Sequence, residues 1–388
     1  MSRDDPFQVA PLARGTNLEF AAEMNRRIVL EAIRDNGAIS RAELAKLTRL
    51  TAQAISNIAA ELITQDLVVT RERVTGQRGP RPTLYSINRF GRFTIGLHLE
   101  PYNLVGVATD LEGGILSEYT SKLEGERPAI TVGIAQRAIE KLLEATPIDR
   151  KACAGVGVAL PGIVREGALT DIAPDNAPEW RGYPFARKLG ELVAMPVLLA
   201  NDATAAAIGE RHHGIGQRYR TFYFVYHSIG IGGCLIVNGA PYRGAHGEAG
   251  EIGHVWVRED GPLCTCGERG CLEQSASLHS LQQVLKLDAE DLRPDRLEAI
   301  MAAGHPGLDA WLDQAARHLR RALHTLRHVV NPEAFVIGGD SPQQMVDALI
   351  TRIGPLDIPV LRAKHLRRGA ALGASASAFP IAEAPAAR

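Results

Sequence analysis

Four side chains of the types that bind zinc lie close together in residues 247–273. Thiolates and imidazole are the ligands that a structural zinc prefers, and four of them complete a tetrahedron. The glycines Gly267 and Gly270 permit a tight knuckle among the cysteines, and the histidine, ten residues before the first cysteine, can return to it through a hairpin. The sequence therefore predicts a structural zinc site with the ligands His254, Cys264, Cys266 and Cys271.

Two other interpretations of these cysteines remain open from the residues alone. They can be ordinary buried cysteines, or they can form disulfides. The disulfide interpretation is the weaker of the two because three knuckle cysteines cannot all pair with one another, and nothing in the chain indicates an oxidising compartment.

A carboxylate lies beside the predicted metal site. Glu251 precedes His254 by three residues, so that both side chains can face the same way and offer hydrogen bonds to sugar hydroxyls. The whole stretch resembles the signature of the ROK family (repressors, open reading frames and kinases). In that family the zinc holds the loop that carries a sugar-binding Glu and His, and the resemblance extends from about Glu23 to Ala378.

A second group of polar residues follows an expected strand end, where α/β folds usually bind ligands. Asn201 and Asp202 stand at the start of an expected helix. In ROK sugar kinases the matching Asp is the general base and the Asn holds the sugar. The alternative for Asp202 is a helix N-cap. The resemblance also places Asn176 and Glu273 on sugar-contacting positions, whereas Glu248 is interpreted as a loop residue. The predicted sugar pocket is Asn176, Asn201, Asp202, Glu251, His254 and Glu273.

The phosphate-binding turns of ROK kinases are altered in this chain. The family's Asp-x-Gly-Gly-Thr turn aligns with residues 98–102, where His98 replaces the Asp and Glu100 and Pro101 replace the glycines. Glutamate adds negative charge, and proline removes a backbone N–H that could bind phosphate. In the second turn, Ile229 replaces a threonine. The resemblance therefore implies that the sugar is sensed and not phosphorylated, so that Asp202 is a ligand contact and no residue is catalytic.

The elements that must position these residues follow an α/β pattern. The sequence predicts strands at 93–99, 104–109, 155–159, 197–200, 222–226, 234–237 and 334–337, and helices at 130–145 and 311–330. Hairpin-like pairs that alternate with helices indicate two similar lobes. The resemblance implies the two-lobed, actin-like fold of sugar kinases, with the ligand bound between the lobes.

The first ninety residues have a different pattern. An apolar stripe begins near Met24, a capping box starts at Ser40, and Thr51 can cap a third helix, which together predict a helix-turn-helix. Two short strands with a basic turn between them predict a wing. Polar residues on the third helix can read major-groove edges, and the wing arginines can meet phosphates or the minor groove. The predicted DNA-binding residues are Thr51, Gln53, Ser56, Asn57, Arg78 and Arg81. A small helical protein-interaction module is the alternative.

The charge distribution agrees with local DNA binding. Residues 1–92 carry 14 Lys and Arg against 10 Asp and Glu, and the remainder carries 29 against 34. A basic N-terminal piece on an acidic body restricts contact with nucleic acid to the N-terminus. There is no apolar run long enough for a membrane span and no signal-peptide core, so a cytoplasmic protein without membrane contact is expected.

These patterns predict a flexible arm at 1–20, a winged helix-turn-helix at 21–90, a two-lobed ROK body at 91–380 and a disordered tail at 381–388. The predicted function is a sugar-responsive transcriptional regulator, most plausibly a repressor of carbohydrate genes. Its expected partners are operator DNA, a monosaccharide or sugar-phosphate inducer and further copies in a homodimer or homotetramer. The alternatives are an ATP-dependent hexose kinase and a repressor whose signal is a docking protein.

Overall fold

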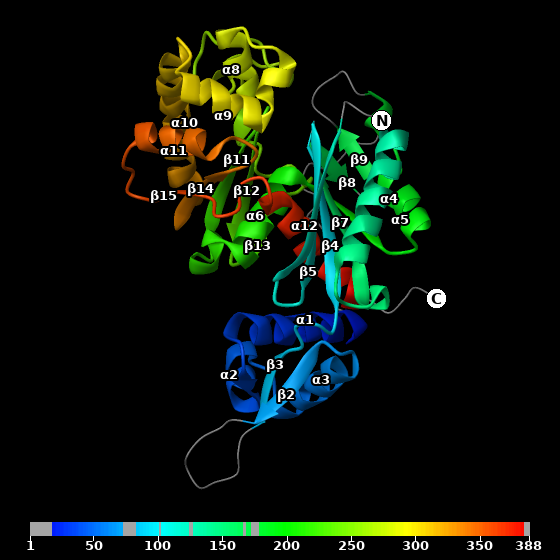
Figure 1. Cartoon of the computed structure of the whole chain (residues 1–388). Coiled ribbons are helices and arrows are strands. Elements are labelled where there is room, and N and C mark those ends of the chain that lie inside the picture. Colours follow the sequence, from blue (N-terminus) through cyan, green and yellow to red (C-terminus); the bar gives the residue numbers. More distant parts are fainter. Residues whose placement is uncertain are drawn as a thin grey trace, which may run out of the picture. The chain divides into compact units, whose positions relative to one another are not determined.

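The computed structural model describes residues 18–72, 83–100, 102–123, 127–165, 168–171 and 178–383. The chain divides into two compact units, residues 1–92 and 93–388 (Figure 1). Each unit has its own sheet and its own buried apolar residues. Within the described ranges, no helix has the length and apolar character needed to span a membrane.

The first unit is a helix-turn-helix with a small antiparallel sheet in the order β1-β3-β2. The predicted capping box is confirmed, since the Ser40 side chain accepts from the Glu43 N–H and the Ser40 N–H donates to the Glu43 carboxylate at 2.9 Å. Thr51 Oγ1 likewise accepts from the Ala54 N–H at 3.1 Å. The elements are α1 (Leu18–Asn36), β1 (Ile39–Ser40), α2 (Arg41–Thr48), α3 (Ala52–Thr64), β2 (Val68–Glu72) and β3 (Thr83–Ile87).

The second unit confirms the two-lobed α/β body. Lobe 1 is built on a sheet of order β10-β7-β4-β5-β6, and lobe 2 on a sheet of order β13-β12-β11-β14-β15. In both lobes the central strand, β4 or β11, pairs antiparallel with the next strand in the chain and parallel with a later one. The two lobes therefore repeat one topology, as the strand pattern predicted.

Lobe 1 comprises the strands β4 (Phe93–Leu99), β5 (Asn103–Asp110), β6 (Ile115–Lys122), β7 (Cys153–Leu160) and β10 (Val197–Asn201), the pair β8 (Ile163–Arg165) and β9 (Ala168–Asp171), and the helices α4 (Pro128–Ala145) and α5 (Phe185–Val193). Lobe 2 comprises the strands β11 (Phe222–His227), β12 (Ile231–Val237), β13 (Ala240–Pro241), β14 (Ala334–Gly338) and β15 (Val360–Arg362). Its helices are α7 (Glu273–Ala276), α8 (Leu278–Leu285), α9 (Pro294–Ala303), α10 (Leu308–Val330) and α11 (Gln343–Ile353).

Two further helices lie between the sheets, α6 (Asp202–His213) and α12 (Gly369–Glu383). Helix α12 packs on β4 and β7 of lobe 1, α6 packs on β12 of lobe 2, and the two helices pack on each other (Figure 1). The approach is close because glycines face backbone: a Cβ on Gly157 would collide with the Ala374 carbonyl, and one on Gly373 with the Ala205 carbonyl. This layer sets the geometry of the site, because α6 begins with Asp202.

The structure corrects the predicted termini. Helix α1 begins at Leu18 and α12 ends at Glu383, so residues 18–20 are not part of a flexible arm and residues 381–383 are not part of a disordered tail. The remaining residues of the predicted arm and tail, and the basic turn of the wing with Arg78 and Arg81, lie outside the described residues.

Candidate functional site: a knuckle beside a carboxylate cluster

The knuckle predicted from the cysteine spacing forms in lobe 2. Its backbone is held by the Cys264 N–H, which donates to the Glu268 carbonyl at 2.7 Å, and by an antiparallel bridge between Trp256 and Cys271. Gly267 and Gly270 both adopt positive φ, 91° and 78°, a conformation that few other residues accept. The bridge returns the chain toward the short 3-10 turn at 252–254, as the hairpin prediction required.

The donor atoms of the knuckle fit a tetrahedral zinc ion. One nitrogen or sulfur from each of the four predicted ligands lies within 4.8 Å of the others. Cys264 Sγ is 3.5 Å from His254 Nδ1, and Cys266 Sγ is 3.6 Å from Cys271 Sγ. Zinc bond lengths at tetrahedral angles require separations of about 3.5 to 3.8 Å. All these sulfurs are free thiols, so the disulfide interpretation does not hold.

The orientation of His254 connects this cluster to the predicted sugar site. Its Nδ1 faces the sulfur of Cys264, which leaves Nε2 as the other hydrogen-bonding atom of the ring. A metal-bound imidazole keeps a proton on its second nitrogen and donates it. The charge of His254 also acts on Glu251. The structure therefore places His254 with one ring nitrogen facing the knuckle and within electrostatic range of Glu251.

Asn201 and Asp202 follow strand β10 and begin helix α6. Asn201, not Asp202, is the N-cap residue: its Oδ1 accepts from the Thr204 N–H at 3.0 Å, and its Nδ2 donates to the Gly162 carbonyl at 3.1 Å. Asp202 accepts from the Ala203 N–H at 2.7 Å. The N-cap alternative for Asp202 is thus wrong. Asp202 is half-buried, and its removal from water raises its pKa, against the effect of His98.

The candidate carboxylates Asp202 and Glu273 both act on Glu251. Partial shielding raises the pKa of Glu251; His254 opposes that shift, and the charges of Asp202 and Glu273 add to it. Glu273 Oε2 accepts from the Ile231 N–H at 3.0 Å, at the start of β12, the strand against which α6 packs. The structure thus places three of the predicted sugar-binding residues, Asp202, His254 and Glu273, within electrostatic range of a fourth, Glu251. A set of acceptors of this kind suits a polyol.

Two further residues named in the sequence analysis, Asn176 and Glu248, are not part of this cluster of described residues. Asn176 lies outside the described residues, so its predicted sugar contact stays a prediction. Glu248, interpreted as a loop residue, is exposed. Its charge also raises the pKa of Glu251, but less than the other causes do. It therefore lies near the cluster without being shown to belong to it.

Sequence reasoning missed a buried network beside Asp202. It comprises His98 and Glu100 at the end of β4 in lobe 1, and Tyr226, Ser228 and Asp340 at the ends of β11 and β14 in lobe 2. We call these five residues the His98 network. Tyr226 Oη is 3.2 Å from His98 Nε2 and donates to Asp340 Oδ1 at 2.9 Å. The network therefore joins the central strands of the two lobes. The signal in the sequence that could have indicated this network is Asp340, a carboxylate directly after the Gly-Gly pair at a strand end.

Charge dominates the behaviour of this network. Burial by itself lowers the pKa of His98, but the carboxylate of Glu100 and the charges of Asp340 and Asp202 raise it to about 9. Burial raises the pKa of Asp340 to about 7, with Glu100 adding to the shift and His98 opposing it. At neutral pH the His98 imidazole is therefore protonated and lies against carboxylates.

The predicted DNA-reading residues lie at the start of α3. Gln53 and Asn57 are exposed on one face, and Gln53 Nε2 donates to Asn57 Oδ1 at 3.0 Å. Thr51 uses its hydroxyl as the helix cap, and Ser56 Oγ donates to the Ala52 carbonyl at 2.9 Å and accepts from Arg41 at 3.2 Å. Gln53 and Asn57 are therefore the pair best placed to meet base edges.

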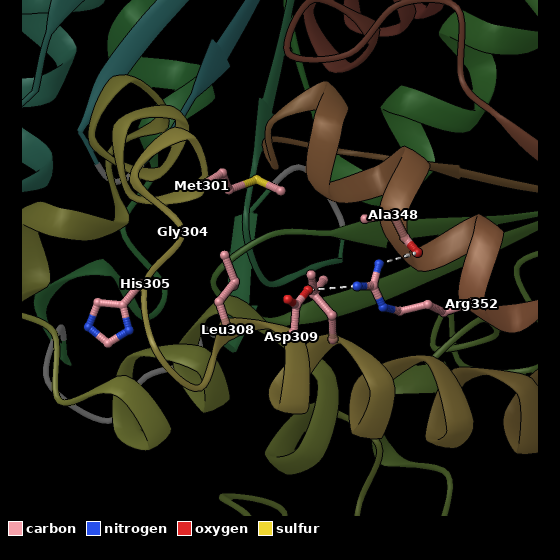
Figure 2. Close-up of a pocket in the computed structure, with 8 residues that line it drawn as sticks. Met301, Gly304, His305, Leu308, Asp309, Ala348 and Arg352 are labelled. Atoms are coloured by element: carbon pink, nitrogen blue, oxygen red, sulfur yellow. Dashed lines mark hydrogen bonds and ion pairs between the residues drawn. The ribbon is translucent and has the colours of Figure 1, made fainter.

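A separate small pocket lies between α9, α10 and α11 of lobe 2 and has a volume of about 230 Å³ (Figure 2). Arg352 projects into it and donates to Asp309 at 2.7 Å and to the Ala348 carbonyl at 3.4 Å. These polar groups are paired with each other, and none of the predicted sugar or metal residues lines the pocket. It is not the candidate site.

Comparison with known families gives two matches. The ROK family model matches residues 96–376, which is most of the chain, and a MarR family model matches residues 25–79. The boundary between the two structural units, after residue 92, lies in the gap between these two matches.

The chain is similar to both regulators and kinases. It is 28% identical to the xylose repressor of Bacillus subtilis over 82% of each chain, and 31% identical to the glucokinase of Streptomyces coelicolor over 63% of this chain and 81% of that one. A solved ROK family transcriptional regulator, described as a homolog of the E. coli MLC protein, aligns with a TM-score of 0.75, 22% identity and coverage of 94% of this chain and 97% of that one. A Streptomyces griseus glucokinase solved with glucose and AMPPNP aligns with a TM-score of 0.63 and 26% identity over 74% of this chain and 99% of that one. The alignment with the solved regulator extends over both structural units of this chain.

Proposed function

Because the chain belongs to the ROK family, we propose that it is a sugar-responsive, DNA-binding transcriptional repressor of carbohydrate genes. A monosaccharide or sugar phosphate binds the body and releases the winged-helix unit from double-stranded operator DNA. The xylose repressors among its relatives support the repressor role and make xylose the first sugar to test. The sugar contacts are Asn176, Asn201, Asp202, Glu251, His254 and Glu273.

One observation carries the proposal: the phosphate turn of a kinase is replaced while the sugar-site residues are kept. Where a kinase of this family has a glycine turn, this chain has Glu100 and Pro101, and Glu100 belongs to a buried network of side chains. A nucleotide phosphate needs free backbone N–H groups and positive charge at this position. Asp202 therefore serves as a hydrogen-bond acceptor for the sugar and not as a catalytic base.

The same mechanism implies the remaining partners. A ligand shifts the conformational equilibrium only through its different affinity for the two states, so sugar and DNA must favour different conformations of the body. Two recognition helices read half-sites about one DNA turn, roughly 34 Å, apart, so the regulator acts as a homodimer or homotetramer. Zinc at His254, Cys264, Cys266 and Cys271 is structural, and the protein acts in the cytoplasm.

DNA binding by the full chain tests this function. Fluorescence anisotropy with labelled DNA from upstream of its own gene is measured at two stated salt concentrations, because phosphate contacts make affinity depend on salt. We expect binding that xylose or another monosaccharide reverses. Gln53→Ala should weaken binding by roughly 5- to 150-fold through the loss of a base contact, and Glu112→Gln on the body should not. Binding that no sugar alters would reject the sugar-responsive half of the proposal.

The kinase is the second candidate, favoured by the presence of Asp202 and by the similarity to glucokinases. ATP-dependent phosphorylation of any sugar by the purified chain, abolished by Asp202→Asn, would establish it. We expect no turnover above the rate without enzyme. A third candidate, a docking protein as the signal, gains support only if DNA binding occurs and no sugar binds.

A further inference from the structure

We propose that the ligand of the body is an uncharged monosaccharide, and that the His98 network closes the Asp202 end of the site to phosphate. This inference rests on the proposed function and narrows it, because that function admits free sugars and sugar phosphates alike. It is carried by three features of the described residues: the position of Asp202, the hydrogen bonds of the network and its charge.

Asp202 lies within electrostatic range of both the sugar cluster and the His98 network. On one side its charge acts on Glu251, and helix α6 packs against β12, where Glu273 is anchored. On the other side its charge acts on His98 and Tyr226. A sugar hydroxyl that donates to the Asp202 carboxylate is therefore within electrostatic range of the network. A phosphate ester at that hydroxyl would remove the proton that Asp202 accepts.

The two hydroxyl donors of the network are already used, whereas His98 Nδ1 makes no hydrogen bond to any described residue. The Tyr226 hydroxyl and the Ser228 hydroxyl each donate to one oxygen of Asp340 at 2.9 Å. Since the single proton of Tyr226 goes to Asp340, its oxygen accepts from His98 Nε2 at 3.2 Å. His98 Nδ1 faces Glu100 Oε1 at 3.5 Å. Phosphate recognition needs several donors directed at one point, and here each one is directed at a carboxylate or at Tyr226.

Four backbone donors of the surrounding turns are also used. The Glu100 N–H donates to the Asn103 carbonyl at 2.8 Å, and the Ser228 N–H to the Gly230 carbonyl at 3.0 Å. The N–H groups of Asp340 and Ser341 both donate to the His227 carbonyl, at 3.2 and 3.3 Å. These four amides are therefore not free to bind phosphate in the way that the outward amides of glycine-rich loops do.

The charge of the network opposes a further anion. A single imidazole faces the carboxylates of Glu100, Asp340 and Asp202, and His98, Glu100 and Asp340 are at most 9% exposed. The pKa of Asp340, raised to about 7 by burial and then by Glu100, shows that a second negative charge is already unfavourable there. A phosphate ester brings a charge of about −1.5 to −2 at neutral pH. A neutral hydroxyl brings none and can donate to Asp202.

Isothermal titration of the zinc-loaded full chain with matched sugar pairs tests the inference. The pairs are xylose and xylose 5-phosphate, glucose and glucose 6-phosphate, and N-acetylglucosamine and its 6-phosphate. For the pair that contains the ligand, we expect the free sugar to bind at least about 100-fold more tightly than its phosphate, since like charges in a shielded site repel strongly. The same pairs are added to the DNA complex, and only the free sugar should release the DNA.

Charge-neutral variants identify the cause. Glu100→Gln combined with Asp340→Asn should narrow the preference for the free sugar by roughly tenfold or more, because the repulsion is removed while the shape is kept. Glu112→Gln, an exposed carboxylate of lobe 1, should leave the preference unchanged. The comparison of free sugar with sugar phosphate uses the unaltered protein, so this test remains valid even if the double variant does not fold.

The outcomes separate the two proposals. A phosphate ester that binds as tightly as its free sugar, or more tightly, and releases DNA overturns the inference and leaves the sugar-responsive regulator intact. Failure of both members of every pair to bind overturns the inference together with the sugar-responsive function. A preference for the free sugar that the double variant leaves unchanged overturns the role of the His98 network.

Discussion

In the proposed function, His254 links metal binding to sugar binding through the two nitrogens of one ring. Because Nδ1 lies 3.5 Å from Cys264 Sγ, a zinc ion in the knuckle would fix both the position and the tautomer of the ring. Without the ion, the ring would be held by one weak contact to sulfur. In the proposed function, the direction of Nε2 toward the sugar then depends on the metal, although the metal itself touches no sugar.

Replacing Cys266 with Ser tests this dependence. The change removes one thiolate of the four donors, so we expect loss of zinc and sugar affinity lowered by roughly 10- to 100-fold, a typical cost when the support of a metal site is removed. Metal content by mass spectrometry and sugar affinity by titration give the two readouts. Cys153→Ser, at a half-buried thiol of lobe 1, is the matched control. Unchanged sugar affinity in zinc-free C266S would show that the ring is positioned without metal.

At the scale of single residues, the sequence analysis predicted site residues that share a short motif. It missed residues that are distant in the sequence and come together only in the fold. The knuckle was found because its cysteines lie within eight positions of one another. Asp340 and Tyr226 were not found, because their partner His98 comes from another lobe and more than a hundred residues away. Single-sequence reasoning has no access to that pairing.

Helix α12 shows what element-scale patterns cannot reveal. Its residues are mostly Ala, Gly and Ser, and its described first eleven residues are buried or half-buried, so it has no polar face and no amphipathic period. The amphipathic α10, by contrast, was predicted closely, at 311–330 against an observed Leu308–Val330. Small residues are needed on α12 because it lies between β7 and α6 with backbone nearly touching backbone.

The Gly157→Ala substitution tests that packing. The new methyl group would collide with the Ala374 carbonyl, which is backbone and cannot move aside, so we expect the free energy of unfolding of the body to fall by roughly 1–3 kcal/mol. Gly133→Ala, in α4 with 3.7 Å of room to the nearest atom, should instead stabilise it by up to about 1 kcal/mol. Urea denaturation compares the two variants. Equal effects would contradict the close approach of α12.

The capping box of α2 gives a second prediction at this scale, confined to the winged-helix unit. Ser40→Ala removes the acceptor for the Glu43 N–H and should destabilise the unit by about 1 kcal/mol. Ser40→Asp restores an acceptor and should recover most of that loss. Thermal denaturation followed by circular dichroism measures both variants. If S40D and S40A unfolded alike, the cap would not contribute.

At the scale of the body, the two lobes are copies of one topology joined by a polar contact between their central strands. His98 in β4 and Tyr226 in β11 meet at 3.2 Å, and Asp340, which follows β14, completes the join. The protonation of one buried imidazole therefore contributes to the stability of the whole body. A repeat of apolar sheets alone would not make that stability depend on pH.

The sign of that dependence follows from the direction of the pKa shift. In the folded body His98 has a pKa of about 9 against an ordinary value of 6.5, so its contribution is complete below pH 6.5 and is lost as pH rises through about 9. This shift in the pKa of His98 corresponds to a contribution to the free energy of unfolding on the order of 3 kcal/mol. The groups that face His98 are Glu100, Asp202, Tyr226 and Asp340. Asp340, with its raised pKa of about 7, acts in the same direction at lower pH, since its ionisation is disfavoured in the folded state.

Urea denaturation of the full chain from about pH 8 to about pH 10, above the titration of Asp340, isolates the histidine. We expect the free energy of unfolding to fall across this range in the unaltered protein and to fall less in His98→Gln, which keeps a side chain of similar size without the titrating charge. His324→Gln, at an exposed histidine, should follow the unaltered protein. If H98Q and the unaltered protein lost stability in parallel, the imidazole would be neutral, and the lobes would be joined by hydrogen bonds and packing without the attraction between the His98 imidazolium and the Asp340 carboxylate.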